Sequence, residues 1–144
     1  MKSIVIDSSV LLATAFVENH SRQAANLLSR RIDEGYSLHA PPLVYYEVVN
    51  VIRKAVYFNR IIEEEGRRFE YRLLATPIET HFSIGLVNRA YELARDLNLP
   101  RTYDMQYLAV AEFLDCAFWT ADQRLFNSAR DAFPSIHWLG TYEE

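Results

Sequence analysis

Four acidic residues far apart in the sequence are the side chains that point most directly to chemistry: Asp7, Glu47, Asp104 and Asp122. Carboxylates brought close together repel one another, and burial penalises the ionised form of each. A hard divalent cation such as Mg²⁺ or Mn²⁺ removes both penalties because it prefers oxygen ligands. Such an ion also activates water and stabilises charge on a phosphodiester. These acids therefore favour metal-assisted hydrolysis, provided that the fold brings them together.

The elements that must position these acids alternate between strands and helices. The predicted strands are short and apolar on both faces, which is typical of a parallel sheet covered on both sides. The sequence therefore predicts an α/β fold, a three-layer α/β/α sandwich with a short, mostly parallel sheet of four to five strands. We expect strands at 3–6, 37–40, 117–120 and 136–139, and helices at 20–34, 43–57, 60–74, 84–97, 102–115 and 122–132.

The alternation places all four acids near one edge of the predicted sheet. Asp7 and Asp122 each come just after a strand, and in parallel sheets the functional crevice lies outside the carboxyl ends of the strands. Asp104 is in the first turn of a helix that a right-handed crossover brings to the same edge. Glu47 is in the first turn of the helix that follows Pro41-Pro42. The four carboxylates are therefore able to converge.

Each acid also has a simpler interpretation. Asp122 could only cap its helix, and Asp104 and Glu47 could only interact with helix dipoles. Asp7 is the hardest to dismiss, because a carboxylate that ends a buried apolar strand is costly without a partner.

Composition indicates one ordinary globular domain, residues 1–144, with half of its residues apolar. The single cysteine, Cys116, excludes an intramolecular disulfide and a cysteine zinc cage. Neither a signal peptide nor an apolar run of membrane-spanning length is apparent, so we expect a cytoplasmic protein that does not bind membranes. The net charge is −4, and residues 101–144 carry 3 basic and 7 acidic side chains, an excess that a bound cation would partly offset.

The sequence resembles the PIN-domain nucleases, and among them the VapC-like toxins of prokaryotic toxin–antitoxin pairs. The resemblance covers nearly the whole chain, in the family's order. It rests on four stretches: Ile4-Val5-Ile6-Asp7-Ser8-Ser9, Glu47-Val48-Val49-Asn50-Val51, Thr102-Tyr103-Asp104-Met105-Gln106-Tyr107-Leu108-Ala109 and Trp119-Thr120-Ala121-Asp122.

The resemblance implies endonucleolytic hydrolysis of RNA at a Mg²⁺ or Mn²⁺ site formed by the four acids. It also implies that Ser8 and Thr120 orient a carboxylate or water, and that Asn50 occupies a common polar position of the family. A homodimer and a cognate antitoxin are the implied partners. Some members carry a further acid soon after the fourth, but here none follows before Asp131, so the number of bound ions stays open.

Other enzyme classes fit less well. A haloacid-dehalogenase-like phosphatase needs a second Asp where this chain has Ser9, and a receiver domain needs an acidic pair and a late Lys. The histidines His20, His39, His81 and His137 show no zinc spacing, and we interpret each as a surface or satisfied structural residue. Two alternatives stay open: an RNA-processing PIN nuclease without an antitoxin, and a non-catalytic PIN module that binds RNA or protein.

Basic and aromatic residues suggest where RNA and partners could bind. Arg53, Lys54 and Arg124 are candidates for contacts with the RNA backbone. For Arg67, Arg68 and Arg72 we favour a solvated helix face paired with nearby glutamates. The aromatics Tyr45, Tyr46, Tyr57, Phe58 and Tyr71 are interpreted first as core packing and otherwise as a partner groove or dimer face.

Overall fold

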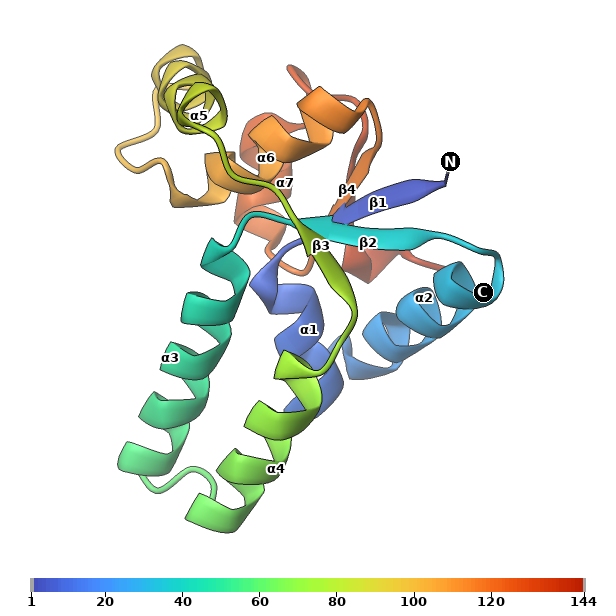
Figure 1. The fold of residues 1–144 in the computed structure, drawn as a ribbon, viewed down its shortest axis with the longest axis vertical. Coiled ribbons are helices and arrows are strands. Elements are labelled where there is room, and N and C mark those ends of the chain that lie inside the picture. Colours follow the sequence, from blue (N-terminus) through green and yellow to red (C-terminus); the bar gives the residue numbers. More distant parts are fainter. Residues whose placement is uncertain (1, 144) are drawn as a thin grey trace.

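A computed structural model describes residues 2–143 as a single five-stranded sheet between two layers of helices (Figure 1). The strand order is β3-β2-β1-β4-β5, and every neighbouring pair is parallel. This confirms the predicted α/β sandwich and gives the upper end of the expected strand number. The strands are β1 (Ser3–Ile6), β2 (Ser37–Ala40), β3 (Ile78–Thr80), β4 (Ala117–Thr120) and β5 (Ile136–Trp138).

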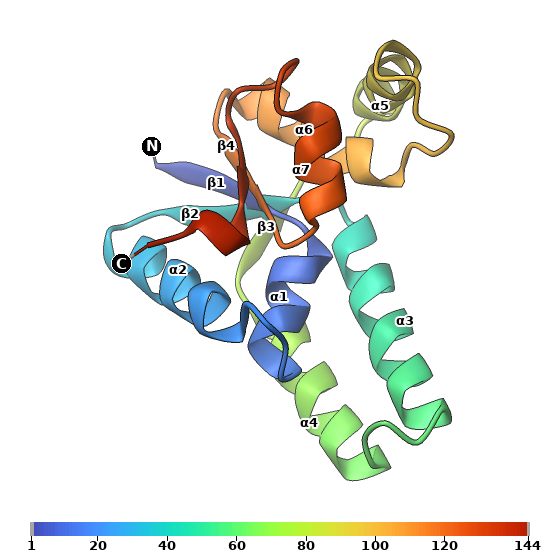
Figure 2. The same ribbon diagram turned by 180° about the vertical axis from the view of Figure 1, so that it is seen from behind.

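The helices form two layers, with α1 to α4 on one face of the sheet and α5 to α7 on the other (Figures 1 and 2). No helix among residues 2–143 is long and apolar enough to cross a membrane. The helices are α1 (Ser8–Ala15), α2 (Ser21–Asp33), α3 (Leu43–Tyr57), α4 (Glu63–Leu74), α5 (Ile84–Asp96), α6 (Tyr103–Leu114) and α7 (Gln123–Ala129), and a short 3₁₀ turn covers Leu139–Thr141.

The order of the strands creates a switch point between β1 and β4. From β1 the chain adds β2 and then β3 on one side, and it later returns to place β4 and β5 on the other. The connections that leave β1 and β4 therefore run to opposite faces of the sheet. A crevice opens at the carboxyl ends of two such strands, and this is where ligands bind in open α/β sheets.

Two regular elements that position functional residues were not predicted from the sequence. Helix α1 is short, and Val10, Leu11, Leu12 and Ala13 are all buried, so it has no polar face and no helical periodicity to detect. Strand β3 is a three-residue edge strand whose side chains are mostly exposed, so it lacks an apolar run. Both omissions follow from elements that do not alternate between buried and exposed positions in the usual way.

The remaining expectations hold with small shifts at the ends of elements. The helix expected at 60–74 begins at Glu63, and the one expected at 122–132 ends at Ala129. Thr102 precedes α6 as expected, but its side chain makes no capping hydrogen bond. The core lies on both faces of the sheet; on the α6 face, the buried Tyr107 stacks on Phe118 of β4 with ring centroids 6.0 Å apart.

The packing of α3 against α4 depends on Gly66. A Cβ atom at this position would lie 2.6 Å from the Val56 Cγ2 atom, and a β-branched side chain has little freedom to move away. We predict that Gly66→Ala lowers the free energy of unfolding by about 1–3 kcal/mol through overpacking, less the roughly 1 kcal/mol that Ala gains over Gly in a helix.

Gly85→Ala is the matched control, because its new Cβ would meet only the Ser83 Oγ atom at 3.7 Å. Chemical denaturation should show this variant to be at least as stable as the wild type. Equal stability of the two alanine variants would contradict the proposed close approach of α3 and α4.

Candidate active site

Asp7 is a buried carboxylate at the switch point, directly after β1. It is the N-cap of α1, and its Oδ1 atom accepts hydrogen bonds from the backbone N–H of Ser9 (3.0 Å) and of Val10 (3.4 Å). Its Oδ2 atom accepts a hydrogen bond of 2.6 Å from the Thr120 hydroxyl at the end of β4. Burial raises the pKa of Asp7 to about 7, because the loss of solvation outweighs these hydrogen bonds and the negative charge of Asp104 adds to it.

Asp122 is joined to Asp7 through the same threonine. The Asp122 backbone N–H donates to the Thr120 hydroxyl oxygen at 3.0 Å, so this hydroxyl accepts from one acid residue and donates to the other. The Oδ1 atom of Asp122 caps α7 by accepting from the N–H groups of Arg124 (2.9 Å) and Leu125 (3.2 Å). The simpler interpretation of Asp122 as a helix cap is therefore correct. It leaves the Oδ2 atom free of hydrogen bonds to the described residues.

Glu47 is held by two hydroxyl groups from the other side of the site. Its Oε1 atom accepts a hydrogen bond from the Ser8 hydroxyl at 3.3 Å and a short one from the Tyr107 hydroxyl. Burial, followed by the hydrogen bond to Glu47 and then by its charge, raises the pKa of Tyr107 far above its usual value, so the tyrosine remains a hydrogen-bond donor. These two bonds connect α3 to α1 and α6.

Asp104 is the acid that connects the other three electrostatically. Partial desolvation, then the charges of Asp122 and Glu47, raise its pKa, and its own charge helps to raise that of Asp7. Among residues 2–143, no donor forms a hydrogen bond or ion pair with its carboxylate. Asp104 and Asp122 both line an open cavity of about 460 Å³.

Two residues that support this site were missed in the sequence. The Ser9 hydroxyl donates a short hydrogen bond to Asp7 and accepts one of 2.9 Å from the Ala121 backbone N–H, so it links α1 to the turn after β4. Tyr107 holds Glu47. Its signal was present, since it follows Asp104 by three residues and therefore lies on nearly the same side of α6. Of the predicted supporting residues, Ser8 and Thr120 contact the acids, whereas Asn50 is exposed one turn beyond Glu47 and contacts none of them among the described interactions.

The structure separates the predicted RNA-contacting residues. Arg124 lines the cavity that contains Asp104 and Asp122. Arg53 lies elsewhere on α3, where its guanidinium is 5.7 Å from the centre of the Tyr57 ring, and it lines a different hollow between α3 and α4. Lys54 is exposed on the same helix. Contact with RNA stays a prediction for all three.

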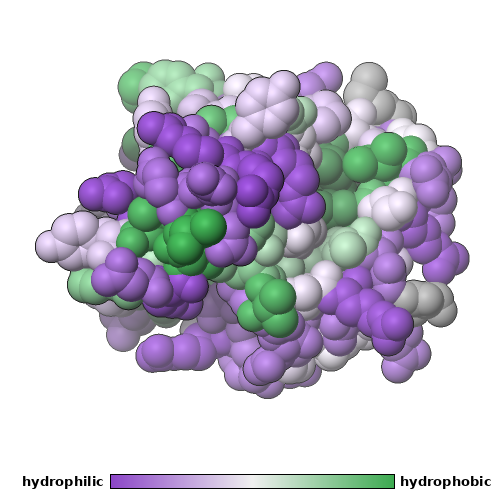
Figure 3. All heavy atoms as spheres, turned by 90° about the horizontal axis from the view of Figure 1, so that it is seen from below, coloured by the Kyte–Doolittle hydropathy of each residue, from purple (hydrophilic) through white to green (hydrophobic). Residues whose placement is uncertain are grey.

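The expectation that the aromatic cluster belongs to the core is mostly wrong. Tyr45 packs against the core, but the other four side chains are largely exposed, because they lie on the outer sides and at the turn of the α3–α4 hairpin. Figure 3 views the molecule from the side of this turn and shows separate apolar patches within a polar surface. The exposed aromatics are Tyr46, Tyr57, Phe58 and Tyr71.

The four acids offer only oxygen donors, as a hard divalent cation prefers, although among the described residues no three of their carboxylates lie within 4.8 Å of one another. The charges of Asp122 and Glu47 raise the pKa of Asp104, and the charge of Asp104 helps to raise that of Asp7. None of the four acids forms an ion pair with a lysine, arginine or histidine within residues 2–143. Oxygen-only ligands with uncompensated negative charge fit Mg²⁺ or Mn²⁺ better than a softer metal ion.

Comparison with known proteins places the chain in a family. A family model described as PIN domain matches residues 4–131. The chain belongs to the PIN-domain family. Ribonuclease VapC9 of Mycobacterium tuberculosis is 30% identical over 131 residues, which are 91% of this chain and 94% of that protein. Ribonuclease VapC12 of the same organism is 32% identical over 119 residues, covering 83% of this PIN domain and 90% of the relative.

Solved structures share the fold of this PIN domain. PAE2754 from Pyrobaculum aerophilum superposes with a TM-score of 0.65 at 21% identity, covering 88% of this chain and 86% of the other. VapBC2 from Rickettsia felis, solved bound to a DNA fragment from its promoter, gives 0.65 at 12% identity over 94% and 96% of the two chains. These likenesses concern the fold.

The raised pKa of Asp7 predicts how stability depends on pH in the metal-free protein. The folded-state pKa lies above the ordinary value of 3.8, so the folded state retains the proton longer than the unfolded chain. Stability should therefore fall as the pH rises from about 4 to about 7, by up to a few kcal/mol. Asp7→Asn has no proton to lose and should avoid this fall, so above pH 7 it should be more stable than the wild type.

Denaturation in the presence of a chelator, at about pH 5 and about pH 8, measures this effect. The quantity of interest is the stability difference between wild type and variant, because the titration of all other groups cancels. A difference that does not change with pH would show that Asp7 is not the group responsible.

Proposed function

We propose that this PIN domain is a metal-dependent endoribonuclease that hydrolyses RNA phosphodiesters at the site formed by Asp7, Glu47, Asp104 and Asp122. The observation that carries the proposal is the electrostatic link between these acids: Asp122 and Glu47 raise the pKa of Asp104, and Asp104 in turn helps to raise that of Asp7. Carboxylates that destabilise one another without a cationic partner are a cost to folding, which a bound divalent cation would offset. The names of the relatives, which are ribonucleases, support the same activity.

Mg²⁺ or Mn²⁺ is the proposed cofactor, with the four acids as its protein ligands. When bound, such an ion lowers the pKa of a water molecule and stabilises negative charge on the phosphate. The chain's own contribution is orientation. Thr120 and Ser9 fix the two oxygens of Asp7, whereas Ser8 and Tyr107 hold one oxygen of Glu47.

The exposed side of the site is where a phosphate group would enter. Asp104 and Asp122 border the open cavity, while Asp7 lies beneath them, only 5% exposed. Arg101 and Arg124 line the same cavity and are placed to attract a polyanion toward the acids. A single-stranded or looped RNA is the substrate class that such a shallow site admits most readily.

An antitoxin and a second copy of the chain are the proposed protein partners. The supporting observations are the exposed aromatics of α3 and α4, since aromatic residues are enriched in interfaces, and the fold shared with toxin–antitoxin proteins. The pocket between these helices combines apolar residues with Arg53, Arg67 and Glu70, a mixture suited to a partner with both apolar and charged side chains.

The central test is cleavage of total cellular RNA with added Mg²⁺ or Mn²⁺, compared with a chelator. We predict that the wild type cleaves only with metal, and that Asp104→Asn lowers the rate more than about 100-fold because it removes a ligand. Asp33→Asn removes an exposed carboxylate at the end of α2 and should cleave like the wild type. Mapping the new ends would identify the sequence or structure that is cut.

Metal-independent cleavage, or undiminished cleavage by Asp104→Asn, would reject the proposed mechanism. RNA binding without any cleavage would instead support a non-catalytic module.

Arg124 gives a second, separate prediction. If it contacts an RNA phosphate, Arg124→Gln should weaken RNA binding and lower the slope of log affinity against log salt concentration by about 1. Arg130→Gln is the control, because Arg130 is exposed at the other end of α7 and lies over the Phe126 ring. Binding measured by fluorescence anisotropy without metal isolates this contact from catalysis. Equal salt slopes for both variants would exclude it.

A further inference from the structure

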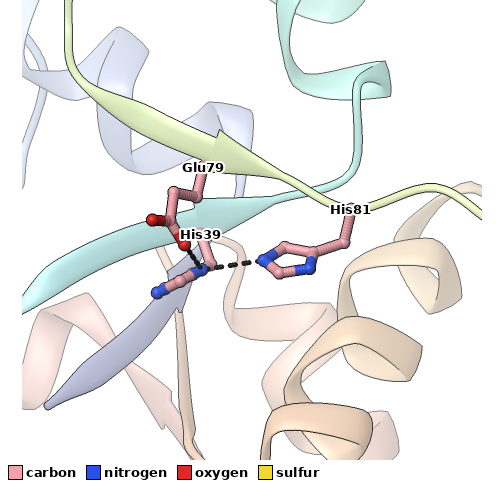
Figure 4. Close-up of side chains that lie close together, drawn as sticks. All are labelled: His39, Glu79 and His81. Atoms are coloured by element: carbon pink, nitrogen blue, oxygen red, sulfur yellow. Dashed lines mark hydrogen bonds and ion pairs between the residues drawn. The ribbon is translucent and has the colours of Figure 1, made fainter. Parts of the chain in front are cut away.

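A second cluster of potential metal ligands lies in β2 and β3, apart from the four acids. Figure 4 shows His39, Glu79 and His81 with their side chains directed toward one another. The Nδ1 atom of His39 is 2.8 Å from the Nε2 atom of His81 and 3.4 Å from the Oε2 atom of Glu79. One ligand atom from each of the three residues lies within 4.8 Å of the others.

The strand register brings these residues together. His39 and Glu79 are direct partners on neighbouring parallel strands, so their side chains lie side by side on one face of the sheet. His81 is two residues after Glu79 and therefore projects on the same face. Its backbone N–H donates to the Ala40 carbonyl at 3.0 Å, which continues the pairing of β3 with β2 beyond the last strand residue. The pairing of β3 with β2 thus positions Glu79 and His81 next to His39.

We propose that His39, Glu79 and His81 form a second metal site, which binds a borderline transition-metal ion of the Zn²⁺ class. Two imidazoles and one carboxylate are a common ligand set for Zn²⁺, with a water molecule in the fourth position, whereas Mg²⁺ prefers oxygen ligands alone. The proposal does not depend on the ribonuclease activity.

The distances suit this ion after a movement of His81. Zn–N and Zn–O bonds of about 2.0–2.1 Å in a tetrahedral site place neighbouring ligand atoms roughly 3.3 Å apart. The separation between His39 and Glu79 already has this value, and the two histidines need to separate by about 0.5 Å. His81 and Glu79, whose ligand atoms lie within 4.8 Å of each other, need to come closer together. The required movement falls to His81, which is only half-buried, whereas His39 is fixed in the sheet at 2% exposure.

His39 makes its polar contacts through one ring nitrogen only. Its Nε2 atom is buried without a hydrogen-bond partner among the described residues. The Nδ1 atom in the cluster is therefore the one through which this side chain makes its polar contacts. The expectation that His39 is a satisfied structural histidine is wrong for its Nε2 atom.

An ion at this position would join the edge of the sheet to its interior. Strand β3 is a short edge strand, and the chain leaves it through His81 toward α5. A bond from His39 through the ion to both β3-segment ligands would hold this segment in place. His81 also lines an apolar groove of about 440 Å³ beside Phe82 and Tyr103, so the ion would fix one wall of that groove.

The test uses the full chain, stripped of metal with a chelator and then supplied with excess Mg²⁺, which covers the carboxylate site. Zn²⁺ is then titrated, with calorimetry for binding and the melting temperature for stability. The wild type should bind Zn²⁺ and melt at a higher temperature, because the ion binds the folded state. His81→Gln and Glu79→Gln should each bind at least about tenfold more weakly, and the rise in melting temperature should be largely lost.

His137→Gln is the control, since this exposed histidine stacks on Trp119 and lies outside the cluster. It should retain the full response to Zn²⁺. His39→Gln is not used, because a change at a buried strand position could alter folding by itself.

Co²⁺ provides a spectroscopic test that separates the two sites. A tetrahedral site with two imidazoles should give strong visible absorption in the wild type and in Asp104→Asn, but not in His81→Gln. The proposal would be overturned if the wild type did not bind Zn²⁺, or if wild type and His81→Gln bound it equally well. Loss of the Co²⁺ absorption in Asp104→Asn but not in His81→Gln would also overturn the proposal, because that result would assign the ion to the carboxylates.

Discussion

The burial of one carboxylate between the ends of β1 and β4 is the constraint on which the rest of the site depends. Asp7 is nearly excluded from solvent, and both its oxygens are held by hydroxyl groups, one from α1 and one from β4. These hydrogen bonds do not fully replace the lost water, because the pKa still rises to about 7. The orientation of the carboxylate is thus fixed while its charge remains poorly solvated, and a divalent cation would gain from both conditions.

Neutral donors, rather than cationic side chains, hold the four acids. Thr120 links Asp7 to Asp122, and Ser8 with Tyr107 secures Glu47. A hydroxyl group orients a carboxylate without cancelling its charge, whereas a lysine or arginine in the same place would compete with a metal ion. Because the hydroxyls of Thr120, Ser8 and Tyr107 each come from a different element than the carboxylate to which they donate, these contacts exist only in the folded chain. The network therefore connects the correct packing of α1, α3, α6 and β4 to the proposed chemistry.

The sequence predicted those features that depend on local pattern and on general rules of topology. Asp7 and Asp122 follow apolar strands. The carboxyl ends of parallel strands meet at one edge of the sheet, and this rule was enough to place both acids there. The sequence did not predict contacts that depend on the register between elements. The contact of Tyr107 with Glu47 requires the packing of α6 against α3, and the meeting of His39 with His81 requires β3. That strand was missed because its exposed, polar positions carry no hydrophobic signal.

The two clusters show how position in one sheet selects the ligand chemistry. At the switch point the acids supply only oxygen donors, and two of them line an open cavity. At the β2–β3 edge it supplies imidazole nitrogens from a buried strand and a carboxylate from an exposed one. Selection between metal ions in proteins depends on donor type and geometry more than on overall affinity. A Zn²⁺-class ion and a Mg²⁺-class ion would therefore divide between the two sites, and the carboxylates would remain available to the ion that phosphodiester hydrolysis requires.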